Sequence, residues 1–585
     1  MSSTFRALET GKSGLLTASI NQDVTGQNIT NANTAGYTRQ STVTSAKTPA
    51  GTGYLISQVY NKQVGQGVRV DNIAQTRSEY LDAQYRTNNS DYNYYTYRSQ
   101  GLGYLTGVFN ELDDDSSITI SLKDFASAVS SFQSDPTSEE YRENLQQETS
   151  SLAQNMNYAY DELVDLWGAQ NDSVSTAAQE INSQLTQVAQ LNEQIARFER
   201  GGTTANDLRD QRNNLLDSLS GMIDITYQTN SDSDSMVDVY IGGEPVVSGS
   251  TAAQLDISTS STVNKASLSS YNVIKLNGKT LTLGDANTVA GADEVVITSG
   301  ELYAHMELVQ SDASTKSGIP YYINQLNTLA RDIAKQVNSI VSAGYTYPDD
   351  ENGNISATGI DLFKSSFGQE INSADEALYY DATAAAAATT TTTNTGYPVY
   401  EATGDTDLDG NAIYAQKVDG DGKKLYYADA SQLTVSTTES AYPAYTYNLT
   451  AGTLALSDEV KESVWNIGAS SAKIDLSAAT TNAKNSDVAS NLYTLVSGNT
   501  FTSELNTFVT HLSITSNTTD GLLSTTESLT NSVSKQRSSL SGVSLDEEAT
   551  NMIMYQQSYS SSARYITTID DMLDKLINGT GKVGL

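Results

Sequence analysis

The chain has 585 residues, of which 38% are hydrophobic, enough for three or four domains with packed cores. Its 33 basic and 69 acidic side chains give a formal net charge of -36, which would repel a phosphate backbone, so we expect no nucleic-acid partner. Cysteine is absent, which excludes disulfides, thiolate catalysis and cysteine-based zinc sites. No run approaches the roughly 18 apolar residues of a membrane span, and the first residues lack the pattern of a Sec signal peptide. We therefore expect neither membrane insertion nor a cleaved signal.

An amphipathic pattern that begins at the first residues predicts a terminal helix within residues 1–38. Positions seven apart hold Leu8, Leu15, Gln22 and Ile29, and the small residues Gly11, Ala18 and Thr25 follow three positions later. Small side chains at such positions permit a second helix to approach closely.

The stretch NITNANTAGYTRQ (28–40) predicts the end of this helix. Asn28 and Asn31 share one helical face, and Gly36 suits the left-handed conformation that ends helices. Tyr37 and Arg39 lie beyond the helix and can anchor the chain where it leaves. The N-terminal assembly motif that we predict comprises Leu8, Leu15, Asn28, Ile29, Asn31, Asn33, Gly36, Tyr37 and Arg39.

The middle of the chain predicts a long helical bundle built from three separated segments, 39–225, 300–345 and 460–542. Thr137 and Glu140 form a capping box after Pro136, and the helical pattern then runs without a breaker to Gly201 and Gly202. That helix would span about 90 Å at 1.5 Å per residue. Further helices are predicted over 204–221, 321–345 and 487–540.

Two β-rich inserts interrupt the predicted bundle. Alternation with period two at 236–249 and 273–298 predicts a small β domain over 226–299, with a tight turn at Gly243. A variable, β-rich outer insert is predicted over 346–459, with low-complexity sequence at 384–393 and a hairpin around Asp421 and Gly422. The fold class is therefore mainly α with inserted β domains.

A second amphipathic helix, the partner of the first, is predicted within residues 543–585, with Ser544 as its N-cap, Glu547 completing a capping box and Gly579 after the last apolar turn. Positions seven apart hold Leu545, Met552, Tyr559, Ile566 and Leu573, and partner positions hold Ala549, Gln556, Ala563 and Ile577. The residues predicted to serve assembly here are Leu545, Met552, Tyr555, Gln556, Gln557, Tyr559, Ala563, Ile566 and Leu573.

The charges of the two ends are complementary. Residues 1–47 carry four basic and two acidic side chains, a net +2, whereas residues 545–585 carry three basic and six acidic, a net -3. Two apolar stripes can each pack on a globular core, which is the ordinary interpretation. Since both stripes lie at the chain ends, where most domains fray, we instead expect a helical pair whose surface is completed on assembly.

Candidate sites for chemistry are weak. Residues 405–416 resemble a calcium loop, with Asp405, Asp407, Asp409 and Gly410 correctly spaced, but Gln416 occupies the position that requires a bidentate Glu. The only histidines, His305 and His511, stand in no HExxH motif, and no GxSxG elbow is present. We expect no metal, no cofactor and no catalysis.

The terminal stretches resemble a family, the axial proteins of the bacterial flagellum, which includes rod, hook and hook-associated proteins. The resemblance rests on NITNANTAGYTRQ and on GVSLDEEATNMIMYQQSYSSSARYI (542–566). The internal stretch NDLRDQRNNLLDSLSGMIDITY (206–227) favours a hook-associated member over a hook or rod protein. Ala35 departs from the family, which often has proline there.

The resemblance implies a structural role at the junction of hook and filament, through stacking of terminal coiled-coil helices. It implies as partners the hook protein, a second hook-associated junction protein, copies of the same chain in a helical ring, and an export chaperone on the C-terminal helix. It also implies an extracellular location, reached through the flagellar type III channel. We expect residues 1–38 and 545–585 to be disordered before assembly.

Three alternatives stay open. A hook or filament subunit would share the same ends but would be needed in many more copies. A surface adhesin would bind its ligand through the 346–459 insert. An enzyme would depend on His305 or His511, and replacing either histidine would test it.

Overall fold

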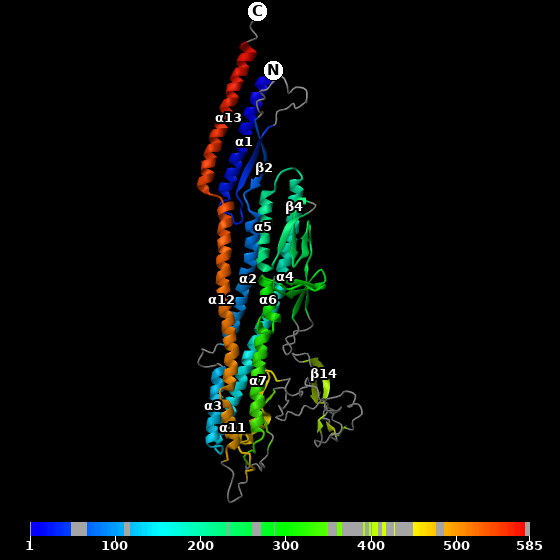
Figure 1. Ribbon diagram of the computed structural model, residues 1–585, viewed down its shortest axis with the longest axis vertical. Coiled ribbons are helices and arrows are strands. Elements are labelled where there is room, and N and C mark those ends of the chain that lie inside the picture. The colour runs from blue at the N-terminus through cyan, green and yellow to red at the C-terminus, as the bar shows by residue number, and fades with distance from the viewer. Residues whose placement is uncertain are drawn as a thin grey trace, which may run out of the picture.

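The computed structural model describes residues 2–47, 67–109, 118–230, 233–259, 271–285, 287–348, 358, 360–365, 449–474 and 485–579, with short strands between 390 and 427. The molecule is elongated, and both chain ends lie at the same end of it (Figure 1). Long helices run along most of its length, and β structure lies on one side, so the architecture is the predicted one, mainly α with inserted β domains.

Two terminal helices form one end of the molecule. They are α1 (Ser2–Thr30) and α13 (Leu545–Gly579), which run side by side (Figure 1). Their contacts place Gly11 against Ile566 and Gly14 against Ser562, so the two helices are antiparallel. Ser544 Oγ accepts a bond from the Glu547 amide at 3.5 Å, as the capping box predicts. The predicted terminal pair is confirmed.

A two-stranded ribbon packs beside α1. It consists of β1 (Gln40–Ala46) and β2 (Val68–Gln75), paired antiparallel. The prediction assigned all of 39–225 to the helical bundle and is wrong at this ribbon. Its two segments, QSTVTSA and VRVDNIAQ, are short and contain β-branched residues, which suit a strand better than a helix.

The bundle surrounds one long central helix, α4 (Glu139–Glu199), whose 61 residues span about 90 Å at 1.5 Å per residue. Its core face includes Trp167, which is fully buried and donates its indole N–H to Val309 O at 2.9 Å. The other bundle helices are α2 (Glu79–Val108), α3 (Ile118–Ser134), α5 (Asn206–Met222), α6 (Glu301–Gln310), α7 (Ile319–Val341), α11 (Asp487–Ser497) and α12 (Thr500–Ser541).

Two helix boundaries differ from the predicted ones. The N-cap of α4 is Ser138, whose Oγ accepts from the Tyr141 amide at 3.4 Å, because the Thr137 hydroxyl instead donates to Asp135. The predicted helix over 487–540 is two helices, since Asn499 adopts a left-handed conformation with a φ of 56° between them. Asparagine tolerates that conformation better than most residues.

The small β domain contains two four-stranded sheets, in the orders β3-β4-β5-β6 and β10-β9-β8-β7. Gly242 and Gly243, with φ of 53° and 84°, make the turn between β4 and β5. The strands are β3 (Thr226–Asn230), β4 (Ser233–Ile241), β5 (Glu244–Ser248), β6 (Thr251–Ala252), β7 (Leu255–Thr259), β8 (Asn272–Leu276), β9 (Lys279–Leu283) and β10 (Glu294–Ile297).

Three asparagines of α4 attach this domain to the bundle. Asn182 exchanges two hydrogen bonds with the backbone of Leu255, at 2.7 and 2.9 Å, as a neighbouring strand would. Asn192 does the same with Val237. Asn171 Oδ1 accepts from the Asn272 amide at 2.7 Å, and Asn272 Nδ2 donates back to Asn171 O at 2.8 Å. Each side chain therefore satisfies strand groups that would otherwise be buried without a partner.

The outer insert joins the bundle through paired strands. β11 (Phe363–Ser365) lies antiparallel to β17 (Leu454–Leu456), next to α10 (Asp458–Glu462) and the 3-10 helix η2 (Val464–Asn466). Further out lie the short strands β12 (Thr390–Thr391), β13 (Tyr397–Pro398), β14 (Tyr400–Thr406), β15 (Ala412–Gln416) and β16 (Tyr426–Tyr427).

The predicted hairpin around Asp421 and Gly422 is wrong in its pairing, because β15 pairs with the preceding β14. The two turn residues themselves, and Asp407, Asp409 and Gly410 of the calcium-like loop, lie outside the described residues. Within the described ranges, no helix is long and apolar enough to cross a membrane.

Candidate functional site: a clasp beneath the terminal helix pair

Asn28, in the last turn of α1, holds the chain that leaves the helix. Its Oδ1 accepts from the Gln40 amide at 3.0 Å and from the Tyr37 hydroxyl at 2.8 Å, and its Nδ2 donates to Gln40 O at 2.9 Å. Asn28 is 1% exposed, so these bonds replace all of its water contacts. Asn31, in contrast, bonds back to Gln27 O of its own helix, and Asn33 is exposed.

The turn that follows requires glycine. Gly36 has a φ of 74°, and a Cβ placed there would lie 2.0 Å from the side chain of Asn214 on α5. The next residue, Tyr37, is held among acidic groups, since burial and the carboxylates of Asp207, Asp210 and Glu548 raise its pKa to about 12. Tyr37 therefore stays neutral and serves as a hydrogen-bond donor.

The first turns of α5 receive this segment. Asp210 accepts from the Thr38 amide at 3.0 Å, from the Thr38 hydroxyl at 2.7 Å and from Gln75 Nε2 at 2.8 Å. Burial raises the pKa of Asp210, and the bonds from Thr38 and Gln75 oppose that rise. Asn206 binds Gln40 Oε1 at 3.0 Å. The first residues of the internal stretch 206–227, which supports the resemblance, therefore contact the N-terminal motif.

Arg39 joins the same place to the C-terminal helix. Its Nε donates to Glu548 at 2.8 Å and its Nη1 to Glu547 at 2.9 Å. Its backbone N–H donates to Ser541 O at 2.8 Å, at the end of α12. The side chain of Glu548 is 3% exposed, so this ion pair is largely shielded from water and its removal would leave a buried charge unpaired.

These contacts define a clasp that consists of residues 28–40, residues 206–210 of α5 and residues 547–548 of α13. It unites three segments that are remote in sequence, at the point where the terminal pair meets the bundle (Figure 1). The partners Gln40, Asn206, Asp210 and Glu548 were not predicted as functional residues. All four lie inside stretches that carry the resemblance, which is the only signal that pointed toward them.

Above the clasp, α1 and α13 meet along a seam of small and apolar residues. A Cβ on Gly11 would lie 2.8 Å from Ile566 Cγ1, so the helices approach as closely as glycine allows. The predicted assembly residues that are partly buried in the pair are Leu8, Leu15, Ile29, Met552, Tyr555, Ala563, Ile566 and Leu573. Those that are exposed are Leu545, Gln556, Gln557 and Tyr559.

Part of the apolar surface of α13 stays exposed beside its seam with α1. Met554, Tyr565, Met572 and Leu576 are between 45% and 54% exposed. They recur at intervals of 11, 7 and 4 residues, which places them within about 40° of one another around a helix of 3.6 residues per turn. A second apolar stripe beside the seam is a surface that a partner helix can cover.

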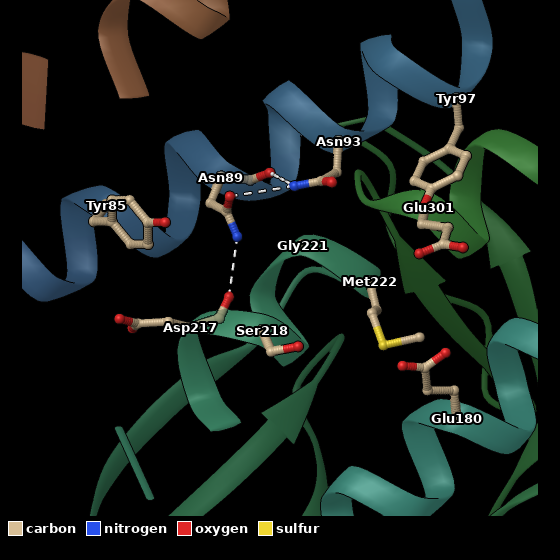
Figure 2. Close-up of a pocket in the computed structure, with 10 residues that line it drawn as sticks. All are labelled: Tyr85, Asn89, Asn93, Tyr97, Glu180, Asp217, Ser218, Gly221, Met222 and Glu301. Atoms are coloured by element: carbon tan, nitrogen blue, oxygen red, sulfur yellow. Dashed lines mark hydrogen bonds between the residues drawn. The ribbon is translucent and has the colours of Figure 1, made fainter. Parts of the chain in front are cut away.

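A polar pocket of about 420 Å³ opens beside α2 and α5, with Glu180, Asp217 and Glu301 on its wall (Figure 2). Asn89 Nδ2 donates to Asp217 O at 3.0 Å, and the Asp217 carboxylate is already paired with Arg86 and Arg537. The remaining lining residues are Tyr85, Asn89, Asn93, Tyr97, Ser218, Gly221 and Met222. None of these lining residues is a histidine, so the hydroxyl of Ser218 has no imidazole base within this pocket.

The two histidines lie in separate packing environments. His305 Nδ1 bonds Gln170 Oε1 at 2.7 Å inside the bundle, whereas His511 contacts the Tyr322 hydroxyl at 3.3 Å and Ser314 O at 3.1 Å. Among the residues that the structure describes, no three His, Asp or Glu side chains are placed to hold a metal ion. The clasp is the candidate site, and it is built from hydrogen bonds and ion pairs between segments remote in sequence.

Three family models match the chain. One is described as the flagellar hook-associated protein FlgK helical domain and matches residues 102–363. A second, the flagellar basal body rod FlgEFG protein C-terminal, matches 534–579, and a third, flagella basal body rod protein, matches 8–38. The latter two matches cover most of the terminal helices, and the first includes the part of the clasp on α5.

Relatives align over nearly the whole chain. The flagellar hook-associated protein 1 of Bacillus subtilis (strain 168) is 26% identical over 607 residues, covering 100% of both chains. Those of Salmonella typhimurium and Escherichia coli (strain K12) are 25% and 24% identical, each covering 97% of this chain and 98% of the relative. The flagellar hook junction protein FlgK from Burkholderia pseudomallei, a solved structure, is 20% identical with a TM-score of 0.40, and covers 67% of this chain and 66% of that one.

Proposed function

This chain belongs to the flagellar hook-associated protein 1 family and is a structural protein of the flagellar hook–filament junction, and we propose that its clasp presents the α1·α13 pair for stacking on neighbouring subunits. As a family member it contacts other axial proteins of an extracellular structure. The α1·α13 pair is the surface that makes those contacts, and the clasp holds it on the bundle.

The partners follow from the direction of stacking. Subunits that stack head to tail share a heterologous interface, which propagates along an axis instead of closing on itself. In this proposal the terminal pair contacts the hook protein on one side, a second hook-associated junction protein on the other and copies of the same chain around the ring. None of these contacts needs a cofactor or a catalytic group.

One observation carries the proposal: the terminal pair is anchored to the bundle and yet keeps an unpaired apolar face. Asn28 and Arg39 bind α1 and α13 to residues 37–40, and Thr38 of that segment binds Asp210 on α5 of the bundle. Met554 and Met572 of α13 nevertheless stay half exposed. A rigid support beneath an uncovered apolar stripe is what a subunit interface requires before its neighbours arrive.

The exposed stripe also bears on how the chain is exported. An apolar helix that is uncovered before assembly is an aggregation hazard, so we propose that an export chaperone covers α13 before secretion. The route is the flagellar type III channel, which an unfolded chain without disulfides suits. Co-purification of the chain with a small helical chaperone, lost when residues 545–585 are removed, tests this part.

The test of the junction role is to delete the gene and view the cell surface by electron microscopy while assaying the medium for filament protein. We expect bare hooks and filament subunits lost to the medium, restored by the intact gene. Cells without hooks would instead identify a hook subunit, and normal filaments would overturn the proposal.

A further inference from the structure

The terminal pair meets the bundle at a bend between α12 and α13. Three residues, Gly542 to Ser544, separate the two helices, and the helix axes change direction there (Figure 1). Among the described elements, α13 packs extensively only against α1. The angle of the pair relative to the bundle therefore depends on the contacts at the bend, together with those that hold α1 to residue Gln40 and to the β1–β2 ribbon.

Arg39 contacts both sides of that bend. Its N–H holds Ser541 O, the last carbonyl of α12, at 2.8 Å, and its guanidinium holds Glu547 and Glu548 in the first turn of α13. Its own carbonyl accepts from the Thr76 amide at 2.9 Å, which fixes the residue to the segment between β2 and α2. A single residue thus connects α12, α13 and the base of the bundle.

We propose that Arg39 is an electrostatic lock that sets the angle between the terminal helix pair and the bundle. Gly542 allows the linker to bend, and the ion pairs with Glu547 and Glu548 select one angle from those the linker allows. When they are broken, the pair still holds together through its own seam at Gly11 and Ile566, and it turns as one body.

The acidic surroundings make the lock depend on this one arginine. Tyr37, one residue away, is surrounded by Asp207, Asp210 and Glu548. Removing the Arg39 guanidinium would leave the buried Glu548 carboxylate without its cation, because Arg77 lies near Asp210 and not near Glu548. Repulsion would then open the bend, where attraction now closes it.

The purpose of the lock rests on the proposed function, since a junction subunit must fit neighbours of two different geometries. The bond to the exposed Glu547 can exchange with water, whereas the bond to the buried Glu548 keeps the arginine in place. Arg39 is 26% exposed and Glu547 62% exposed at their side chains, so water can replace one of the two bonds.

The test measures the angle in the free chain. Because the chain has no cysteine, two can be introduced as single labelling sites, Ser524→Cys on α12 and Ser558→Cys on α13, both exposed. Each site lies within about 26 Å of the bend at 1.5 Å per residue, which places the spin labels in the range of pulsed electron paramagnetic resonance.

We expect one narrow distance distribution in the doubly labelled parent chain. Arg39→Ala should lose that single distance and give a broad distribution with unchanged helix content by circular dichroism, and Arg39→Lys should fall between them, since lysine cannot bind both carboxylates in a fork. The matched control is Arg69→Ala on β2, whose ion pair with Asp71 is remote from the bend; it should leave the narrow distance intact.

Three results would overturn the lock: identical distributions in the parent and in Arg39→Ala, a parent distribution that is already broad, or loss of helix content together with the broadening. The last would mean that Arg39 holds the helix itself and not its angle. The measurement needs no flagellum, so a negative result would rule out the lock and leave the junction role untouched. The junction role is tested separately, by whether the deletion strain has bare hooks.

Discussion

At the scale of single residues, the abundance of asparagine has a structural reason. Asn28, Asn182 and Asn192 each use both ends of the amide group to bind a backbone N–H and a backbone C=O of another segment. An amide side chain can supply such a pair because it carries a donor and an acceptor side by side. Asn28, which the sequence marks as part of a helix-ending motif, therefore also links distant segments, as the asparagines of α4 do.

Asn28→Ala tests the fastener in the clasp. The substitution leaves the Gln40 amide and carbonyl buried without partners, which costs about 1–3 kcal/mol, so exchange of the Gln40 amide should accelerate by about tenfold or more. Asn33→Ala, in the same motif but exposed, is the matched control and should leave that exchange unchanged. Equal rates in the two variants would show that the Asn28 bonds do not hold the segment.

Glu199 gives the α4–α5 turn a dependence on pH. Burial raises its pKa, but hydrogen bonds from Arg209, Ser235 and the Ala205 amide outweigh that effect and lower the pKa from 4.5 to about 2. A carboxyl with a depressed pKa adds stability above its ordinary value, and that stability is lost as the pH falls toward about 2. We expect peptides over residues 200–206 to exchange faster as the pH drops from 5 to 2, after correction for intrinsic rates.

In Glu199→Gln this turn should exchange fast at both pH values, because the charge that Arg209 binds is gone. Retention of the pH dependence in that variant would assign it to another group.

At the scale of elements, the apolar periodicity and the capping residues predict the helices, but they do not predict which helices contact one another. The capping box at Ser544 and the apolar period gave α13 its limits. The heptad repeat did not predict the buried face of α13. In a straight helix, positions seven apart rotate around the axis by about 20° per heptad, or about 80° between Leu545 and Leu573. Leu545 is accordingly 53% exposed while Leu573 is partly buried.

The clasp shows why its partners escaped prediction. Thr38 and Asp210 are 172 positions apart, and Arg39 and Glu548 are 509 apart. A single sequence has no local signal for such pairs, since each residue alone is an ordinary polar surface residue. The β1–β2 ribbon escaped for another reason: its strands are short, and their pairing is settled by packing against α1.

Two glycines of α1 test whether the seam fixes the helix pair. Gly→Ala within a helix gains up to about 1 kcal/mol from propensity alone. Gly26→Ala, which would meet nothing within 4 Å, should show that gain, whereas Gly11→Ala would place a Cβ 2.8 Å from Ile566 and should destabilise the pair. The measurement is hydrogen exchange of residues 562–570 in both variants; equal protection would mean that close approach at Gly11 is unimportant.

The stability of the terminal helices in the unassembled chain can be tested separately. The sequence predicts disorder in the purified chain, whereas the structure has both helices formed and paired, so we expect a pair that is folded but opens more readily than the bundle. The exposed stripe at Met554 and Met572 offers little cooperative protection, so we expect α1 and α13 to exchange much faster than α4 in a monomer. Protection of the terminal helices equal to that of α4 would contradict this.

At the scale of the whole molecule, the outer insert can be separated from the axial function. Its roots pair, with Ser365 opposite Leu454, so a short Gly-Ser linker can replace residues 366–448 without disturbing the bundle. We expect this variant to restore filaments in a deletion strain. Loss of filaments would make the insert part of the junction, and normal motility with reduced binding to cells or glycans would support the adhesin alternative for the insert alone.

The central claim is that the clasp holds the α1·α13 pair for stacking at the junction. Electron cryo-microscopy of isolated hook–filament junctions tests it most directly. We predict that density for α1 and α13 lines the inner wall, with the pair stacked head to tail on subunits above and below and Arg39 at the root of each subunit. Terminal helices that lie away from the axis, or that contact no neighbouring subunit, would contradict the account.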